Sequence, residues 1–224
     1  MKILITGATS GIGFELVKQL CADGHTVYAT GRNSDKLEEL QQTLGCKIGI
    51  YDLSDSSQVV SMFHHAVEAL DGLDVLINNA GMNSRKCPIE ALTVEELDHQ
   101  YAINLRAPMI LSREAIKVMQ PQQSGHIINV TSTVAKRSNE TMSVYTAMKQ
   151  GLVGFTGVLM KEAQPHGIKV TNLIPGGTDT NFRLADKPEY MAAESVAQTI
   201  RTILNLPKDV IVHEMLFRPA IELE

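Results

Sequence analysis

The sequence of 224 residues has only three cysteines and no long apolar run, and each shortage excludes a class of protein. Cys21, Cys46 and Cys87 are odd in number and lack CxxC spacing, which argues against a disulfide framework. No stretch approaches the roughly 18 apolar residues of a membrane-spanning helix. The start, Met1–Gly7, lacks the apolar core of a secretory signal. We therefore expect a cytoplasmic protein with reduced thiols and no membrane partner.

Positive charge is also scarce. Lys and Arg total 20 against 25 Asp and Glu, for a formal net charge of −5, so no basic surface for nucleic acid is expected. The seven histidines show no metal-ligand spacing, and we expect no bound metal. Small molecules and other proteins remain as partners.

Short apolar runs alternate with amphipathic segments along the whole chain. The runs are rich in β-branched residues and bounded by Gly, Asp, Asn or Pro, which favours strands. Their continuous apolarity is typical of parallel strands buried on both faces. The alternation predicts an α/β fold: one doubly wound parallel sheet of about seven strands with helices on both faces, in a single domain covering residues 1–224. The predicted strands are Ile3–Ile5, Val27–Thr30, Ile48–Tyr51, Val75–Ile77, Ile127–Val130, Val170–Ile174 and Val210–Val212.

One predicted helix contains a conflict. Thr93 with Glu96 three residues later is a capping box that starts the helix. Pro108 then interrupts its pattern and should kink or split the helix just after Asn104. Asn104 near such a kink can simply satisfy a freed backbone group.

A glycine-rich turn, TGATSGIG at residues 6–13, joins the first predicted strand to the first helix. A helix N-terminus presents free N–H groups and partial positive charge to a phosphate, and glycines let the backbone approach a pyrophosphate. The spacing is GxxxGxG and glycines also make plain turns, so its position between strand and helix supports the interpretation. The predicted dinucleotide contacts are Gly7, Thr9, Ser10, Gly11, Ile12 and Gly13.

The end of the second predicted strand lacks the acidic residue that binds the ribose 2′-hydroxyl of NAD. The chain reads Thr30-Gly31-Arg32-Asn33 there. The planar guanidinium of Arg32 suits a 2′-phosphate, although it can also be a solvated loop arginine. We therefore predict NADP(H) as the cofactor.

Tyr145 is the only one of five tyrosines with a lysine four residues later, Lys149. In a helix this spacing puts both side chains on one face, and an ammonium lowers the pKa of a nearby phenol. Ser132 follows a predicted strand 13 residues upstream, where its hydroxyl can hydrogen-bond a substrate carbonyl. Alone, Ser132 would be an ordinary turn residue.

Together these pieces resemble the short-chain dehydrogenase/reductase family. The matching segments are TGATSGIG (6–13), NNAG (78–81), Asn104, Ser132, YTAMK (145–149) and PGGTDT (175–180), in family order and spacing. The chain after Thr180 resembles the family more loosely.

The resemblance implies a catalytic group and further cofactor contacts. Tyr145 exchanges a proton with the substrate oxygen, Lys149 binds the nicotinamide ribose and lowers the tyrosine pKa, Ser132 orients the substrate oxygen and Asn104 holds a water. Asp52 and Leu53 border the adenine, and Pro175, Gly176 and Thr178 border the nicotinamide side. Asn79, Ala80 and Gly81 line the cofactor crevice. The asparagines of NNAG can instead connect strand ends.

The resemblance also implies a homodimer or homotetramer, because relatives pair the helix after Lys149 across a subunit boundary. Gly151, Gly154 and Gly157 form a stripe there that suits close helix packing. Two departures bear on the substrate: segment 135–143 is polar, and the substrate loop near 180–194 is short. Both favour a small or polar carbonyl or alcohol substrate.

The sequence bears on three alternatives to an NADP(H)-dependent oxidoreductase. A non-catalytic dinucleotide-binding regulator would be expected to lose Tyr145 or Lys149, and the chain keeps both. An NAD-linked alcohol dehydrogenase is disfavoured by Arg32. A sugar-nucleotide epimerase or dehydratase needs a separate substrate domain, which the about 40 residues after Thr180 cannot build.

Overall fold

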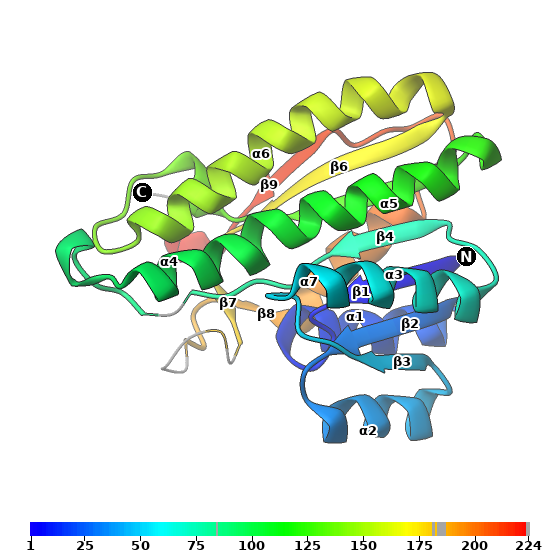
Figure 1. The fold of residues 1–224 in the computed structure, drawn as a ribbon, viewed down its shortest axis with the longest axis horizontal. Coiled ribbons are helices and arrows are strands. Elements are labelled where there is room, and N and C mark those ends of the chain that lie inside the picture. The colour runs from blue at the N-terminus through cyan, green and yellow to red at the C-terminus, as the bar shows by residue number, and fades with distance from the viewer. Residues whose placement is uncertain (84, 181, 183–186, 223–224) are drawn as a thin grey trace.

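The computed structural model describes residues 1–83, 85–180, 182 and 187–222. Its centre is a seven-stranded sheet with the order β3-β2-β1-β4-β5-β6-β9 (Figure 1). Every neighbouring pair is parallel, and the strand order reverses between β1 and β4. Ligands bind at such a switch point, beyond the carboxyl ends of the strands. The strands are β1 Lys2–Thr6, β2 Thr26–Gly31, β3 Lys47–Ile50, β4 Val75–Asn78, β5 Gly125–Val130, β6 Ile168–Pro175 and β9 Glu214–Phe217.

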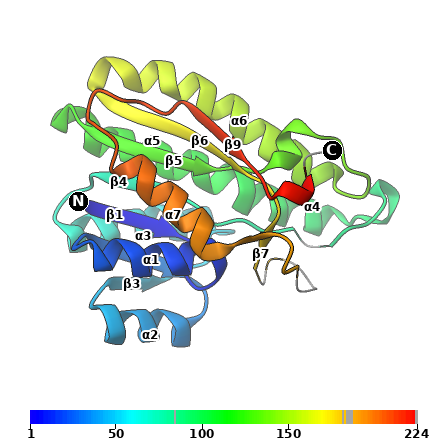
Figure 2. The ribbon, with the colours of Figure 1, turned by 180° about the vertical axis from the view of Figure 1, so that it is seen from behind.

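Helices cover both faces of the sheet (Figures 1 and 2). Each layer buries its own apolar cluster. Side chains alternate along β1: Ile3 and Ile5 enter one cluster, whereas Leu4 enters the other. Burying an aliphatic side chain of this size contributes about 1.5–3 kcal/mol, so both layers stabilise the sheet. One layer holds α1 Gly11–Ala22, α2 Ser34–Leu44 and α7 Ala193–Leu204; the other holds α3 Ser56–Leu70, α5 Ala107–Gln122 and α6 Ser143–Ala163. The predicted doubly wound parallel sheet is thus confirmed.

The prediction of a strand at Val210–Val212 is wrong. The Val210 N–H donates to the carbonyl of Pro207 at 3.0 Å, so the chain is still turning there. The seventh strand begins at Glu214, where Met215 and Phe217 pack against the core. Apolar composition alone did not show where the chain first pairs with β6.

The predicted kink or split after Asn104 takes the form of a widened turn, and the backbone stays helical from Val94 to Gln122. The capping box of Thr93 and Glu96 starts α4, Val94–Tyr101. A wider π-helical turn, Ala102–Arg106, then leads into α5, where Pro108 occupies the first turn. The wider turn accommodates Pro108, which cannot donate the i→i−4 hydrogen bond of a regular helix. Asn104 lies in the π-helical turn and is fully buried.

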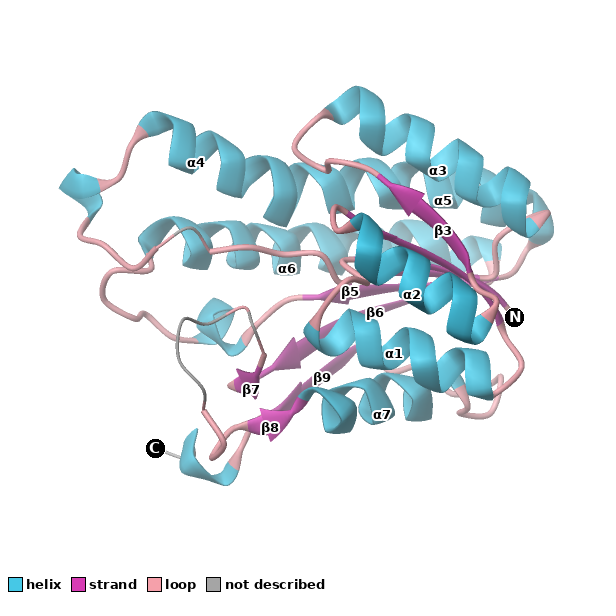
Figure 3. Ribbon diagram, turned by 90° about the horizontal axis from the view of Figure 1, so that it is seen from below, coloured by secondary structure: helices cyan, strands magenta, loops and turns pink. Residues whose placement is uncertain are grey.

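A small second sheet pairs β7 Thr178–Asp179 with β8 Met191–Ala192 beyond the carboxyl end of the main sheet (Figure 3). A Cβ atom on Gly11 would lie 2.9 Å from the Thr180 methyl group, so this segment covers the glycine-rich turn. Of the predicted substrate loop near 180–194, residues 181 and 183–186 lie outside the described residues. Short 3-10 turns complete the elements at Ile89–Ala91, Thr133–Lys136, Gln164–His166 and Ala220–Glu222. Within the part of the chain that is described, no helix has the length and apolarity needed to cross a membrane.

Candidate active site

The glycine-rich turn is packed too tightly for side chains at two of its glycines. Gly7 has φ of +68°, and a Cβ atom there would lie 2.8 Å from the Cα of Ala80. A Cβ on Gly13 would overlap the carbonyl oxygen of Gly7 and lie 2.6 Å from Nδ2 of Asn79. Helix α1 therefore packs directly on the turn. Ser10 precedes this helix as its N-cap residue but makes no capping hydrogen bond with its side chain.

Asn79 ties the end of β4 to this turn. Its Nδ2 donates to the carbonyl oxygens of Thr6 at 3.0 Å and Gly7 at 3.2 Å, and its backbone N–H donates to Oγ1 of Thr6 at 3.1 Å. The side chain of Asn79 thus connects strand ends, one of the two possibilities that the sequence left open. Ala80 and Gly81 continue past it as partly buried backbone.

Replacing Gly13 by alanine tests this close packing. The added methyl group requires the turn to shift, so we expect Gly13→Ala to weaken dinucleotide binding at least about tenfold, or about 1.4 kcal/mol, and to lower Tm by several degrees. Titration of NADPH fluorescence and thermal unfolding measure the two effects. Lys18→Ala, on the exposed side of the same helix, is the control and should change neither. If Gly13→Ala bound the dinucleotide normally, the close packing of α1 on the glycine-rich turn would not be needed for binding.

The predicted adenosine end brings Arg32 and Asp52 close enough to interact. Arg32 is exposed beyond β2, next to Asn33, whose side chain caps α2. The backbone N–H of Ser54, at 2.9 Å, chiefly lowers the pKa of Asp52, and the charge of Arg32 contributes. Leu53 is buried beside them. A Cβ atom on Gly31 would lie 2.5 Å from the Thr9 methyl group, so a side chain at 31 would disturb the glycine-rich turn.

Lys149 is a buried cation beside Tyr145 on α6. Its Nζ donates to the Val130 carbonyl at 3.0 Å and lies 5.7 Å from the centroid of the Tyr145 ring. Burial disfavours the charged ammonium and lowers the pKa of Lys149 to about 8. Tyr145 itself is 6% exposed, and its ring lies 5.8 Å from that of Phe182. The lysine thus remains largely charged at neutral pH, within electrostatic reach of the phenol.

Asn104 and Gly81 complete the surroundings of this cation. A Cβ atom on Gly81 would lie 3.5 Å from Nζ of Lys149 and 3.2 Å from Oδ1 of Asn104. The Asn104 side chain accepts the N–H of Met82 at 3.0 Å and donates to the carbonyl oxygens of Met82 at 2.7 Å and Gln100 at 3.0 Å. The Asn104 amide therefore connects the π-helical turn to the loop after β4. Its side chain satisfies backbone groups that the distorted helix leaves without partners, as the sequence suggested.

Ser132 begins the turn that follows β5. Its Oγ accepts the N–H of Val134 at 3.3 Å, a long and weak contact. Val130, two residues earlier, binds Lys149, so the end of β5 places Ser132 near the tyrosine–lysine pair. The structure thus brings together Asn104, Ser132, Tyr145 and Lys149 from three separate segments: the π-helical turn, the turn after β5 and helix α6.

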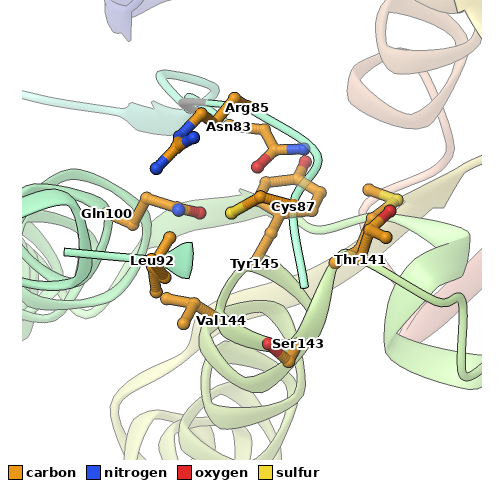
Figure 4. A pocket seen from close by; sticks show the side chains of 10 residues that line it. Asn83, Arg85, Cys87, Leu92, Gln100, Thr141, Ser143, Val144 and Tyr145 are labelled. Carbon is orange, nitrogen blue, oxygen red and sulfur yellow. The ribbon is translucent and has the colours of Figure 1, made fainter. Parts of the chain in front are cut away.

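Tyr145 also lines a small cavity, with about 10 Å³ of free space, that the sequence did not predict (Figure 4). The volume suits a single water molecule. One wall is Thr141, whose φ of +66° is unusual for a β-branched residue. No sequence pattern marks this wall. The other lining residues are Asn83, Arg85, Cys87, Leu92, Gln100, Met142, Ser143 and Val144.

A larger hollow of about 370 Å³ lies beside the glycine-rich turn. Lys36 is a cation in its wall that the site prediction omitted; it pairs with Glu39 at 2.6 Å and lies 5.7 Å from the Phe14 ring centroid. Its position four residues after Arg32 in the sequence could have marked it as a second cation of the site. The remaining lining residues are Thr9, Ser10, Gly11, Glu15, Asp179, Thr180, Ala192, Ala193 and Glu194.

The predicted nicotinamide side is the loop that leaves β6. Pro175 is the buried last residue of the strand, and the Gly176 N–H donates to the Phe217 carbonyl at 2.7 Å. Thr178 enters β7, and its hydroxyl donates to the Gly176 carbonyl at 3.2 Å.

A parallel sheet with a switch point, and a glycine-rich turn at the N-terminus of α1, define a Rossmann-like, dinucleotide-binding class of fold. The family model described as short chain dehydrogenase matches residues 1–190. The chain therefore belongs to the short-chain dehydrogenase/reductase family of oxidoreductases.

Individual proteins resemble the chain along most of its length. An uncharacterised oxidoreductase of Staphylococcus aureus is 32% identical over 224 residues, covering 97% of this chain and 96% of that protein. The structure of an alcohol dehydrogenase from the archaeon Thermococcus sibiricus, complexed with 5-hydroxy-NADP, has a TM-score of 0.90 at 26% identity and covers 99% of this chain and 97% of that one. The closed form of a serine dehydrogenase complexed with NADP⁺ has a TM-score of 0.92 and covers 100% and 97% of the two chains, but its 24% identity shows likeness of fold alone.

Proposed function

We propose that this protein is an NADP(H)-dependent oxidoreductase that interconverts a small polar carbonyl compound and its alcohol, with Tyr145 as the proton donor and acceptor. The observation that carries the proposal is the buried Lys149 ammonium 5.7 Å from the Tyr145 ring centroid. A screen of carbonyl compounds with the purified protein, following NADPH absorbance, tests it. Absence of turnover with every class of carbonyl would contradict it.

The cofactor site fits a dinucleotide. The glycine-rich turn has no room for a side chain at Gly7 or Gly13, which suits close approach of a pyrophosphate to its backbone N–H groups. The Thermococcus sibiricus alcohol dehydrogenase structure, which is 26% identical and holds 5-hydroxy-NADP, supports the same choice here. We assign the pyrophosphate to residues 7 and 9–13, the 2′-phosphate to Arg32, the adenine to Asp52 and Leu53, the crevice to residues 79–81, the nicotinamide ribose to Tyr145 and Lys149, and the nicotinamide side to Pro175, Gly176 and Thr178.

The nicotinamide, when bound, supplies or accepts the hydride. In the reducing direction Tyr145 donates its phenolic proton to the substrate oxygen, and in the oxidising direction the phenolate takes that proton back. Lys149 stabilises the phenolate by its charge. Ser132 donates a hydrogen bond to the substrate oxygen while negative charge develops there. We assign Asn104 to hold both the loop after β4 and a water near Lys149.

The dinucleotide preference depends on Arg32 in this proposal. A charge-assisted hydrogen bond contributes about 1.5–3 kcal/mol, so we expect kcat/KM to favour NADPH over NADH at least about tenfold. Arg32→Ala should weaken NADPH and leave NADH almost unchanged. Both cofactors are compared with one substrate at one salt concentration.

Arg113→Ala, an exposed arginine on α5, is the matched control and should keep the full preference. Equal weakening of both cofactors by Arg32→Ala, or preference for NADH in the unmodified protein, would instead favour the NAD-linked alternative. A Gly31→Asp variant is a poorer test, because its side chain meets Thr9.

The retained tyrosine–lysine pair disfavours the regulator alternative. The polar segment 135–143, which leads into the helix of Tyr145, supports a small polar substrate.

We also propose that residues 1–224 act as one cytoplasmic catalytic domain that assembles into a homodimer or homotetramer. A Cβ atom added to Gly154 or Gly157 would meet nothing within 4 Å, so α6 offers an open stripe to a second helix. Gly151 instead meets Leu105 of its own chain. Light scattering of the purified protein measures the subunit number.

A further inference from the structure

The carboxyl-terminal turn of the chain reaches the loop that follows β6. Glu222 ends the 3-10 turn Ala220–Glu222, and its Oε1 accepts the backbone N–H of Gly177 at 3.1 Å. Gly177 is buried, so this N–H depends on a protein acceptor. The contact joins residues 45 positions apart in the sequence.

The carboxylate of Glu222 fills the space above two glycines. A Cβ atom on Gly176 would lie 2.6 Å from Oε2 of Glu222, and a Cβ on Gly177 would lie 2.8 Å from Oε1 and 2.7 Å from the ring of Tyr190. Alanine at either position would therefore displace the carboxylate. The pair of glycines in PGGTDT suits this direct contact between backbone and carboxylate.

Two arginines hold the turn in place without using the carboxylate. The carbonyl oxygen of Glu222 accepts hydrogen bonds from Arg137 at 2.6 Å and from Arg218 at 3.0 Å. Arg137 ends the turn that starts at Ser132, and its neighbour Lys136 pairs with Glu214 at 3.1 Å. Part of the polar segment 135–143, a departure from the family pattern, thus anchors the turn Ala220–Glu222 beside the site.

We propose that Glu222 is a positioning residue that fixes the Gly176–Thr178 loop in the conformation that binds the nicotinamide half of NADP(H). The inference rests on the proposed function, since that function assigns this loop to the cofactor. Without the carboxylate, the buried Gly177 N–H lacks an acceptor and the loop must rearrange to satisfy it. The loop would then reach its binding conformation only at a cost in cofactor affinity.

Three variants separate the hydrogen bond from general stability. Glu222→Ala should raise the Kd and KM of NADPH about tenfold, equivalent to about 1.4 kcal/mol, while kcat stays within about twofold. Its Tm should hardly change, because the backbone anchors to Arg137 and Arg218 remain. Glu222→Gln keeps an acceptor oxygen and should restore binding to within about threefold of the unmodified protein. Glu68→Ala, which removes an exposed carboxylate on α3, is the control and should bind NADPH normally.

Hydrogen exchange without cofactor is the second measurement. The Gly177 amide should exchange faster in Glu222→Ala and stay protected in Glu222→Gln. Normal NADPH binding and normal Gly177 protection in Glu222→Ala would overturn the inference, and so would equal losses in the alanine and glutamine variants. An unmodified protein that binds NADPH but reduces no carbonyl would contradict the proposed function alone.

Discussion

Tyr145→Phe should abolish turnover while leaving NADPH binding almost unchanged. The phenylalanine ring keeps the packing of a side chain that is 6% exposed and lies 5.8 Å from the Phe182 ring. Only the hydroxyl is lost, and with it the proton that the substrate oxygen needs. General acid–base catalysis contributes about 10²–10⁴-fold, so we expect kcat to fall by at least about 10². Steady-state kinetics and NADPH fluorescence titration measure the two quantities.

Tyr101→Phe is the matched control for this variant. Tyr101 ends α4 and is 39% exposed, and it has no lysine four residues later. Its hydroxyl should be dispensable, with kcat within about twofold of the unmodified protein. If Tyr145→Phe kept more than a tenth of the activity, the proton-transfer role of Tyr145 would be wrong.

Lys149→Met should lower activity sharply and stabilise the protein at neutral pH. The folded protein holds the pKa of Lys149 at about 8, below the ordinary 10.5, because burial disfavours the ammonium. Burial of that charge therefore costs stability at all pH values below about 8. The cost disappears as pH rises from about 8 to 10.5, where the unfolded chain binds more protons than the folded protein.

Methionine fills a similar volume without the charge. One pKa unit corresponds to 1.36 kcal/mol, so the removed cost is on the order of 3 kcal/mol. Loss of the hydrogen bond to Val130 offsets about 1 kcal/mol of it. We expect the free energy of unfolding in urea to rise by about 1–2 kcal/mol at pH 7, and the gain to vanish near pH 10.

Activity should change in the opposite direction. Residual alcohol oxidation by Lys149→Met should shift to higher pH, because no ammonium then favours the Tyr145 phenolate. Lys161→Met, an exposed lysine on the same helix, should alter neither stability nor the pH profile. A destabilised Lys149→Met variant with an unchanged pH profile would refute both the burial cost and the tuning of Tyr145.

Local patterns predicted much of the fold. Six of the seven predicted strands overlap strands of the sheet, and the exception is Val210–Val212. Short apolar runs indicate burial wherever they occur, but pairing requires a neighbour. Residues 210–212 are apolar but precede the paired strand, whereas β9 has only alternate apolar residues facing the core. An edge strand covered on one face resembles a loop more than a central strand does.

The candidate site also has features that the sequence predicts and features that only the packing reveals. Tyr145 and Lys149 lie on one helix, so the regular turn of that helix sets their relation from sequence spacing alone. The close packing around the glycine-rich turn, by contrast, does not follow from residue spacing. Residue order shows glycine at 7 and 13, but only packing shows that Ala80 and Asn79 occupy the space beside them. Asn79 likewise had two possible roles until the ends of β1 and β4 came together.

The sequence by itself determined the features that depend on neighbours along the chain: the turn between β1 and α1, the capping box at Thr93, the helix distortion before Pro108 and the tyrosine–lysine spacing. Only the tertiary structure decided the long-range contacts, including the burial that lowers the pKa of Lys149 and the contact between Glu222 and Gly177. The physical reason is the range of the forces involved. Steric and backbone hydrogen-bonding preferences act within a few residues, whereas desolvation and close packing depend on segments that meet only after the sheet has formed.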